Sequence, residues 1–314
     1  MKIFSLGVLL LLVFLSVTIS AQRNFSPVSL VPEKSIAVLR VNWSQVRANE
    51  KLKQIVSGES FAQLANQTGV SENKITEWVV VSDINPTSAR GMGIIMAGSF
   101  TAQSVVAFAK SKDWKAEKIG TNTAFLNPAD NSYLMPLRNG LLAAGTKTGM
   151  EKVQGVMVKP RASILGKEPF SAVWTQIGGG RQPISFYAGI PPEYQKVADI
   201  GFKIATKLMD LASFGLMGTI FEAIGLVRST GFTVSYKKDA FPTELVAIMD
   251  SETKAWVASG ALNLLKKAPS AVNLQARTAE EEAMLKSLQT MSASYKKEVL
   301  SVKFEMPESA MVKP

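Results

Sequence analysis

The sequence predicts an α+β protein of two similar βαββαβ halves, with antiparallel or mixed sheets packed by helices. Three observations predict this class. Segments in which apolar residues alternate with period two lie between segments with helical spacing. The order strand, helix, strand, strand, helix, strand occurs twice, and this is the order of ferredoxin-like units. The strand-to-helix junction Ser99-Phe100-Thr101 also has a counterpart in Ser251-Glu252-Thr253.

In the first half, the apolar runs predict strands over residues 36–41, 78–81, 94–96 and 123–126. Helices are predicted after Asn42 and over residues 101–110, where Ala102, Val105, Val106 and Ala109 share one face. A hairpin over residues 133–137 and 141–144 and a helix over 149–156 are additional to the repeated order.

In the second half, strands are predicted over residues 184–190, 232–236 and 245–249. Helices are predicted from 193 to about 225, from 252 to 267 and from 278 to 294. Glu280, Glu281 and Glu282 in the first turn of the last helix suit the helix dipole. The closing strand directs one set of apolar residues to one face: Leu300, Val302, Phe304 and Met306.

The first 21 residues have the pattern of a secretory signal peptide. Lys2 precedes an apolar stretch from Leu6 to Val17, which is shorter than the roughly 18 residues that span a bilayer. Cleavage is expected near Ser20 or Ala21. The predicted domains are then a first half over 22–158, a Pro/Gly-rich linker over 159–182, a second half over 183–306 and a tail over 307–314. A single mixed sheet across both halves would give the same element order.

The composition excludes several classes of chemistry. The chain has no cysteine and no histidine, so it has no disulfide, Cys/His zinc site, haem histidine, thiol nucleophile or Ser-His-Asp triad. A secreted chain without cysteine fits a bacterial periplasm. The net charge of +10 favours contact with anionic envelope surfaces. The lysines are dispersed, which argues against a nucleic-acid partner.

Two short motifs resemble catalytic or phosphate-binding signatures. Ser71-x-x-Lys74 followed by Lys147-Thr148-Gly149 matches the order found in serine β-lactamases, but Ser71 precedes a strand and does not open a helix. Gly178-Gly179-Gly180-Arg181 lacks the Lys-Ser/Thr pair of a phosphate-binding loop and is interpreted as a flexible loop. No catalytic residues, metal or cofactor are therefore predicted.

Residues 197–227 form an unusually apolar stretch with helical spacing. A core helix pair is the favoured interpretation. The alternative is an exposed surface that binds lipid, an acyl chain or a protein, with these candidate residues: Phe214, Leu216, Met217, Ile220 and Phe221.

The five tryptophans are predicted to be at least partly buried. Trp78 and Trp256 fall within element patterns and are predicted to be core residues. Trp43, Trp114 and Trp174 lie near element ends, where they could line a groove.

The segment Val31-Pro32-Glu33 leads into the first strand. In this and in its element order, the chain resembles uncharacterised secreted bacterial families built from weakly repeated α+β halves. The resemblance implies no catalytic residue. The predicted function is a secreted or periplasmic, non-enzymatic binding or envelope-associated protein. The alternatives are a lipid- or membrane-surface-associated protein using 197–227 and a hydrolase that relies on neither His nor Cys. Candidate partners are envelope lipid, an anionic polymer or another envelope protein.

Overall fold

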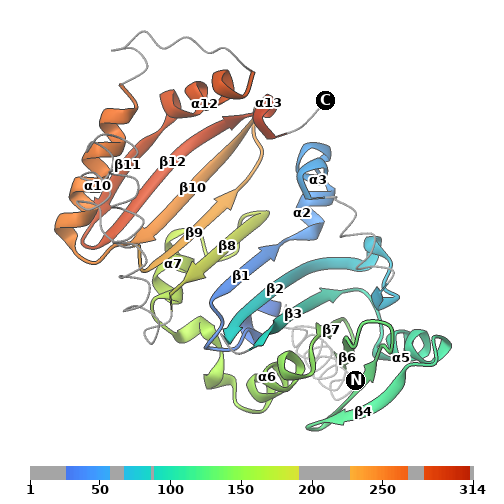
Figure 1. Cartoon of the computed structure of the whole chain (residues 1–314). Coiled ribbons are helices and arrows are strands. Elements are labelled where there is room, and N and C mark those ends of the chain that lie inside the picture. The colour runs from blue at the N-terminus through green and yellow to red at the C-terminus, as the bar shows by residue number, and fades with distance from the viewer. Residues whose placement is uncertain (1–25, 57–66, 86–87, 191–226, 268–278, 312–314) are drawn as a thin grey trace, which may run out of the picture.

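The computed structural model describes residues 26–56, 67–85, 88–190, 227–267 and 279–311, which form one α+β unit around a single large sheet (Figure 1). The sheet has twelve strands in the order β11-β12-β10-β9-β8-β1-β2-β3-β7-β6-β5-β4. Every pair of neighbouring strands is antiparallel. The pairing of β1 with β8 joins the strands of the first half of the chain to those of the second half.

The strands follow the apolar alternation of the sequence, with polar edges at both ends of the sheet. Their bounds are β1 (Ala37–Val41), β2 (Ile75–Asn85), β3 (Ser88–Gly98), β4 (Lys115–Ile119), β5 (Asn122–Leu126), β6 (Tyr133–Arg138), β7 (Leu141–Gly145), β8 (Ile184–Gly189), β9 (Ser229–Val234), β10 (Ala240–Ile248), β11 (Ser292–Lys296) and β12 (Val299–Pro307).

The α-helices are α2 (Trp43–Arg47), α3 (Glu50–Val56), α5 (Ala102–Ser111), α6 (Lys147–Val158), α7 (Phe170–Gln176), α10 (Glu252–Leu265), α12 (Ala279–Thr290) and α13 (Glu308–Met311). Four short 3-10 helices are η1 (Pro27–Leu30), η2 (Glu72–Lys74), η3 (Pro160–Ala162) and η4 (Ile164–Gly166). Several helices begin at a residue whose side chain accepts a backbone hydrogen bond, which satisfies an N–H group that has no partner within the helix. These residues are Asn42, Thr101, Thr146 and Ser251.

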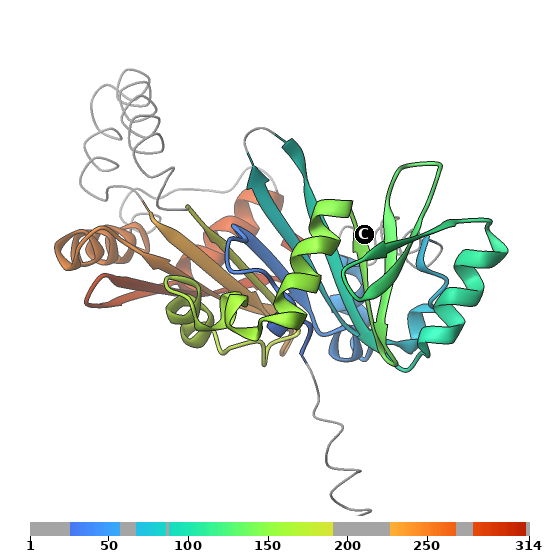
Figure 2. The same cartoon turned by 90° about the horizontal axis from the view of Figure 1, so that it is seen from below.

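Each face of the central strands is buried under its own set of helices. In β2, Trp78 packs in a cluster with α2, α3 and α5, whereas Val79 and Val81 pack with η1, α6 and α7. This division follows from the period of two along a strand. Figure 2 shows α6 crossing over the strands of this part of the sheet.

A smaller third cluster lies at the C-terminal end of the sheet. There, α10 and α12 cover one face of β10 and β12, with Ala255, Ala258 and Leu300 buried between them. The alternation predicted for the closing strand holds, because Val302 and Phe304 belong to this same cluster.

The structure confirms an α+β protein but does not confirm two ferredoxin-like halves. In a ferredoxin-like unit, a helical crossover places the first and third strands side by side in parallel. Here the described strands pair with antiparallel neighbours, and the two halves of the chain share one sheet. The order of most described elements was predicted, but element order does not determine which strands pair.

Two strands were not predicted because both lie at sheet edges and are polar. β4 has the sequence Lys-Ala-Glu-Lys-Ile and is largely exposed. The end of the predicted helix 278–294 is wrong, because residues 292–296 form the edge strand β11. Charged and polar side chains are typical of edge strands, where they oppose further pairing. They also remove the apolar alternation that sequence reasoning depends on.

The 159–182 connection contributes to the core. It contains η3, η4 and α7, and the side chains of Phe170, Val173 and Trp174 are buried. The rings of Phe170 and Trp174 stack with centroids 5.0 Å apart. This packing places α7 beside a hollow on the η1 and α6 face of the sheet.

Candidate functional site

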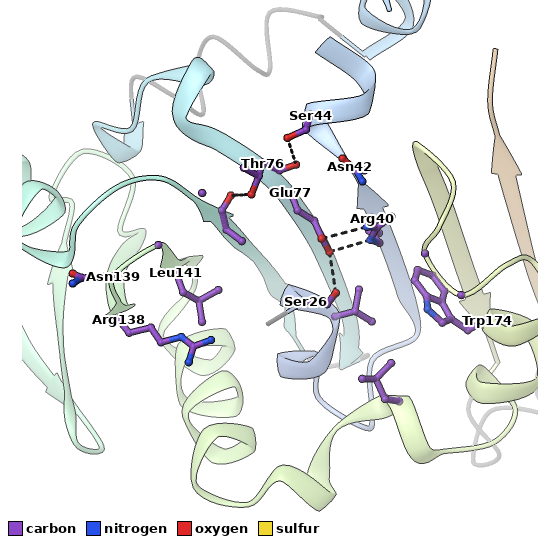
Figure 3. A pocket seen from close by; sticks show the side chains of 17 residues that line it. Ser26, Arg40, Asn42, Ser44, Thr76, Glu77, Arg138, Asn139, Leu141 and Trp174 are labelled. Atoms are coloured by element: carbon purple, nitrogen blue, oxygen red, sulfur yellow. Dashed lines mark hydrogen bonds and ion pairs between the residues drawn. The ribbon is translucent and has the colours of Figure 1, made fainter. Parts of the chain in front are cut away.

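An open cleft of about 1110 Å³ lies on the face of the sheet that carries η1 and α7 (Figure 3). Strands β1, β2 and β3 supply its floor. The β6–β7 turn, η4 and the residues after α7 supply its walls. Its lining includes the side chains of Ser26, Arg40, Thr76, Glu77, Arg138 and Trp174.

A buried ion pair lies in the floor of the cleft. Arg40 on β1 and Glu77 on β2 lie on the same face, because β1 and β2 pair antiparallel with Arg40 opposite Val79. Arg40 Nε donates to Glu77 Oε1 at 3.0 Å and Arg40 Nη2 donates to Oε2 at 3.2 Å. The side chains are 7% and 16% exposed. A two-point contact of this kind is geometrically specific and strong.

Further groups complete the hydrogen bonding of the pair. Ser26 Oγ donates to Glu77 Oε1 at 3.0 Å, and Arg40 Nη1 donates to the carbonyl of Gln182 at 3.1 Å. Glu77 is thus held by a guanidinium and a hydroxyl together.

The Gly178–Gly180 loop closes over this pair. All three glycines have positive φ, of 89°, 53° and 80°, and side chains rarely adopt this region. A Cβ atom at Gly180 would lie 3.1 Å from Arg40 Nε. The amide of Gly179 donates to the carbonyl of Trp174 at 2.6 Å. Gly180 therefore approaches the arginine closely, and the positive φ values account for the run of three glycines.

Most polar side chains around the cleft are already engaged by the fold. Thr76 Oγ1 donates to the carbonyl of Ala97 at 3.1 Å. Asn42 caps α2, and Asn139 accepts from the amide of Ala102 at 3.0 Å. Arg138 adds a second cation, which Figure 3 shows reaching from the end of β6 toward the cleft. Several polar side chains of the cleft thus already have hydrogen-bond partners within the described part of the chain.

The residues of the β-lactamase-like motif do not line the cleft. Ser71 precedes η2, at the start of β2. Lys147 begins α6 and its Nζ lies 3.3 Å from Glu117 on β4. Together with Tyr133, Lys147 lowers the pKa of the Glu117 carboxyl. Lys147 thus contributes to a partly exposed ion pair between α6 and β4 and is not among the residues that line the cleft.

The other predicted site residues have different outcomes. The candidate surface Phe214, Leu216, Met217, Ile220 and Phe221 lies outside the described residues, as does nearly all of 197–227. Trp174 lines the cleft, as its place near an element end allowed. The prediction of Trp256 as core is wrong, because it is 58% exposed on α10.

Sequence reasoning missed the Arg40–Glu77 pair. The available signal was a charge inside each of two apolar strands, since Arg40 interrupts an Ala-Val-Leu run and Glu77 precedes Trp-Val-Val-Val. Buried charges are rare unless they are paired. Two such interruptions on the same face of neighbouring strands would have predicted the pair, but strand pairing was unknown.

Within the described residues, no group of three His, Cys, Asp or Glu side chains is arranged to hold a metal ion. In that same part of the chain, none of the helices has both the length and the apolar character needed to cross a membrane.

Comparison with known proteins identifies the fold alone. No family model matches the chain, and no curated protein matches it. Among solved structures, crystal form IV of TP0453 is similar, with 12% identity and a TM-score of 0.51, over 91% of this chain and 95% of that chain. Crystal form III of TP0453 gives 12% identity and a TM-score of 0.49, over 92% and 96% of the two chains. The likeness to form IV extends over nearly the whole length, so the overall fold resembles that of another solved protein.

Proposed function

We propose that the chain is an envelope-associated, non-enzymatic binding protein that holds its ligand in the cleft above β1, β2 and β3. The observation that carries this proposal is that the carboxylate in the cleft is already paired with other side chains of the protein. Glu77 is the carboxylate among the residues that line it, and Arg40 and Ser26 already engage both of its oxygens. A site of this kind recognises by shape and fixed charge, because no acid–base pair is poised for proton transfer.

The envelope location rests on the predicted signal peptide and on the net positive charge. Crystal form IV of TP0453 has a similar fold at 12% identity. Fold alone does not transfer function, so location needs its own test. We expect the cell-derived protein to begin at Ala21 or Gln22 and to fractionate with the envelope. N-terminal sequencing that finds Met1 on a cytoplasmic protein would contradict this.

The proposal that the cleft holds the ligand is tested by filling the cleft with a large side chain. Ser44 is exposed on α2 and lines the cleft, so Ser44→Trp places a large ring there without disturbing the core. Ser104→Trp on α5 is the matched control, because Ser104 is exposed and outside the cleft lining. Small molecules that co-purify with the protein from its own envelope fraction are released by denaturation and identified by mass spectrometry. We expect Ser44→Trp to lose them and Ser104→Trp to keep them.

A second candidate function is contact with a membrane surface, and one feature of α10 favours it. Trp256 and Leu264 are 58% and 69% exposed. With Thr253 and Gly260 they share the outward face of the helix, since Ala255 and Ala258 are buried on the other face. Lys266 and Lys267 follow, both exposed. An apolar stripe beside lysines suits an anionic bilayer.

Vesicle co-sedimentation tests this second function. The double variant Trp256→Ala/Leu264→Ala is expected to bind phosphatidylglycerol vesicles less than the unmodified protein does. Val158→Ala on α6 is the control, because Val158 is 62% exposed and lies away from α10. Hydrogen exchange over residues 197–227, with and without the same vesicles, shows whether the membrane contact is made by α10 or by the segment predicted from sequence. Protection of 197–227 by vesicles with no effect of the α10 variant would favour that segment.

A further inference from the structure

A second hollow adjoins the cleft and is more apolar. It has a volume of about 610 Å³ and lies between η1, the β6–β7 turn, the end of α6 and the η3–η4 segment. Arg138, Leu141 and Leu165 line both hollows. The two are therefore continuous, and we call the second one the side groove. Its volume falls within the roughly 300–1,000 Å³ that is usual for small-molecule sites.

The side groove has an apolar floor and an apolar wall. Leu30, Leu141 and Val156 line it and belong to the core, with exposed fractions of only 2–3%. Leu165 on η4 forms part of the wall and is 41% exposed. A large aliphatic side chain left open to water beside an apolar floor offers area for an apolar ligand to bury.

The charges around the side groove have one sign. Arg138, Arg161 and Lys167 are its charged lining residues, and no carboxylate is among the described residues that line it. Lys167 Nζ lies 3.0 Å from Glu33, a residue outside the lining, so part of its charge is offset. Arg138 and Arg161 add positive charge to this lining, and a guanidinium group has planar donors that suit a carboxylate or phosphate group.

We propose that the side groove binds a single-chain anionic amphiphile of the envelope, such as a lysophospholipid or fatty acid. The acyl chain lies along Leu30, Val156 and Leu165, and the anionic head contacts Arg138 and Arg161. This assignment rests on the proposed binding function, for which it names the ligand class. A free phosphate would satisfy the arginines but would leave the leucine wall exposed.

The test uses defined probes on the full chain, below their micelle concentrations, by isothermal titration calorimetry. Myristoyl-lysophosphatidylglycerol carries both the acyl chain and the anionic head. Myristoyl-lysophosphatidylcholine keeps the chain with a zwitterionic head, and inorganic phosphate is the head alone. We expect the first probe to bind at least about tenfold more tightly than the second, because two arginines face the head. We expect phosphate not to bind measurably.

Two variants locate the site. Leu165→Glu places a like charge beside the head and removes apolar wall, and Arg161→Glu reverses one of the cations. Each is expected to weaken binding of the anionic lysolipid by about tenfold or more. Tyr295→Glu on β11 is the matched control, since Tyr295 is as exposed as Leu165, at 41% each, and lies outside the groove lining. Thermal unfolding of every variant checks that it folds. If Leu165→Glu folds poorly, Leu165→Ala tests the apolar wall without adding a charge.

The outcomes separate this inference from the proposed function. Tight binding of phosphate alone would overturn the amphiphile and leave a simple anion site. Equal binding by Leu165→Glu, Leu165→Ala and unmodified protein would overturn the groove. Lysolipid binding lost in Leu165→Glu but kept in Ser44→Trp would support the groove even if the cleft held nothing. If Ser44→Trp loses the co-purifying ligand and the unmodified protein binds no lysolipid, the cleft proposal would be supported and the amphiphile proposal would be contradicted.

Discussion

The central and C-terminal parts of the sheet use ion pairs in different surroundings. Arg40 and Glu77 lie in the floor of the cleft between covered strands, with side chains 7% and 16% exposed. Lys303 and Glu244 pair across β12 and β10 at 3.5 Å, with side chains 65% and 24% exposed. The charges are of the same types, but one pair is largely removed from water and the other is solvated.

This difference shows where the sheet is covered. Around β2, both faces are packed in hydrophobic clusters. In β12, Leu300 and Val302 pack beneath α10 and α12, while Ser301 on the opposite face donates to Glu244 at 3.1 Å. Strands that are buried on both faces need apolar side chains on both faces or fully paired charges. Strands that are buried on one face can alternate apolar residues with polar residues that face the solvent. The cleft lies where the cover on the central strands is interrupted.

The largest expected effect comes from breaking the central ion pair. Glu77→Ala leaves the Arg40 guanidinium buried without its carboxylate, which costs about 3–5 kcal/mol. Glu244→Ala removes the solvated counterpart and is expected to cost less than about 1 kcal/mol. Urea unfolding measures both free energies. Equal losses would mean that the two surroundings do not differ as the exposures indicate.

Replacing one tryptophan in each region by alanine compares how much side-chain packing contributes to stability in the two regions. Trp174 is 6% exposed against Phe170, so Trp174→Ala is expected to cost about 3 kcal/mol through the cavity it leaves. Trp256→Ala on α10 is expected to cost less than about 1 kcal/mol, because that ring is 58% exposed. Guanidinium unfolding of the two variants tests this, and a large loss at Trp256 would show that its ring packs in solution.

Alkaline pH is expected to act on Tyr187 in the central region. Burial, and secondarily Glu168, raises the pKa of Tyr187 to about 12 from 10.0. The folded state then keeps a proton that the unfolded chain releases, so this stability is complete below pH 10 and is lost as pH rises toward 12. The loss amounts to about 2 kcal/mol. Tyr187→Phe should flatten the fall in unfolding free energy over this window.

Tyr236, near the C-terminal end of the sheet, provides the contrast. Its pKa is also raised to about 12, but the first cause is the hydrogen bond to Glu308, with burial second. Glu308→Gln should therefore lower the pKa of Tyr236 and leave that of Tyr187 unchanged. Tyrosinate absorbance during an alkaline titration follows both groups. An equal response of the two tyrosines would contradict the assigned causes.

The smallest expected effect is in the glycine loop. Gly180→Ala must keep a φ of 80° and place a Cβ atom 3.1 Å from Arg40 Nε, which together cost about 1–2 kcal/mol. Gly155→Ala in α6 meets nothing within 4 Å and is expected to gain up to about 1 kcal/mol, because alanine favours helices. Thermal unfolding compares them, and a stabilised Gly180→Ala would refute the close-approach argument.

Local patterns predicted much of the secondary structure. The run at residues 78–81 became the centre of β2, and the helix expected over 101–110 begins one residue later, after the capping Thr101. The hairpin of β6 and β7 was also located correctly. These elements depend on neighbours in sequence, so alternation and capping residues identify them. The polar edge strands β4 and β11 carry no such pattern.

The candidate site was largely beyond sequence reasoning. Trp174 and the glycine run were noticed, yet the run was interpreted as a flexible loop, and nothing in the sequence connected it with Arg40. The link is tertiary, because Arg40, Glu77 and Gly180 are separated in sequence and meet only when β1 pairs with both β2 and β8.

The sequence by itself determined the α+β class, the order of most elements and the absence of cysteine and histidine chemistry, since these depend on composition and local periodicity. Tertiary structure decided that the two halves share one antiparallel sheet, that Arg40 meets Glu77, and that Trp256 faces outward while Trp174 is buried. The physical reason is that strand partners and helix faces are selected by burial across the whole molecule. A local pattern shows which residues prefer to be buried, but not what will cover them.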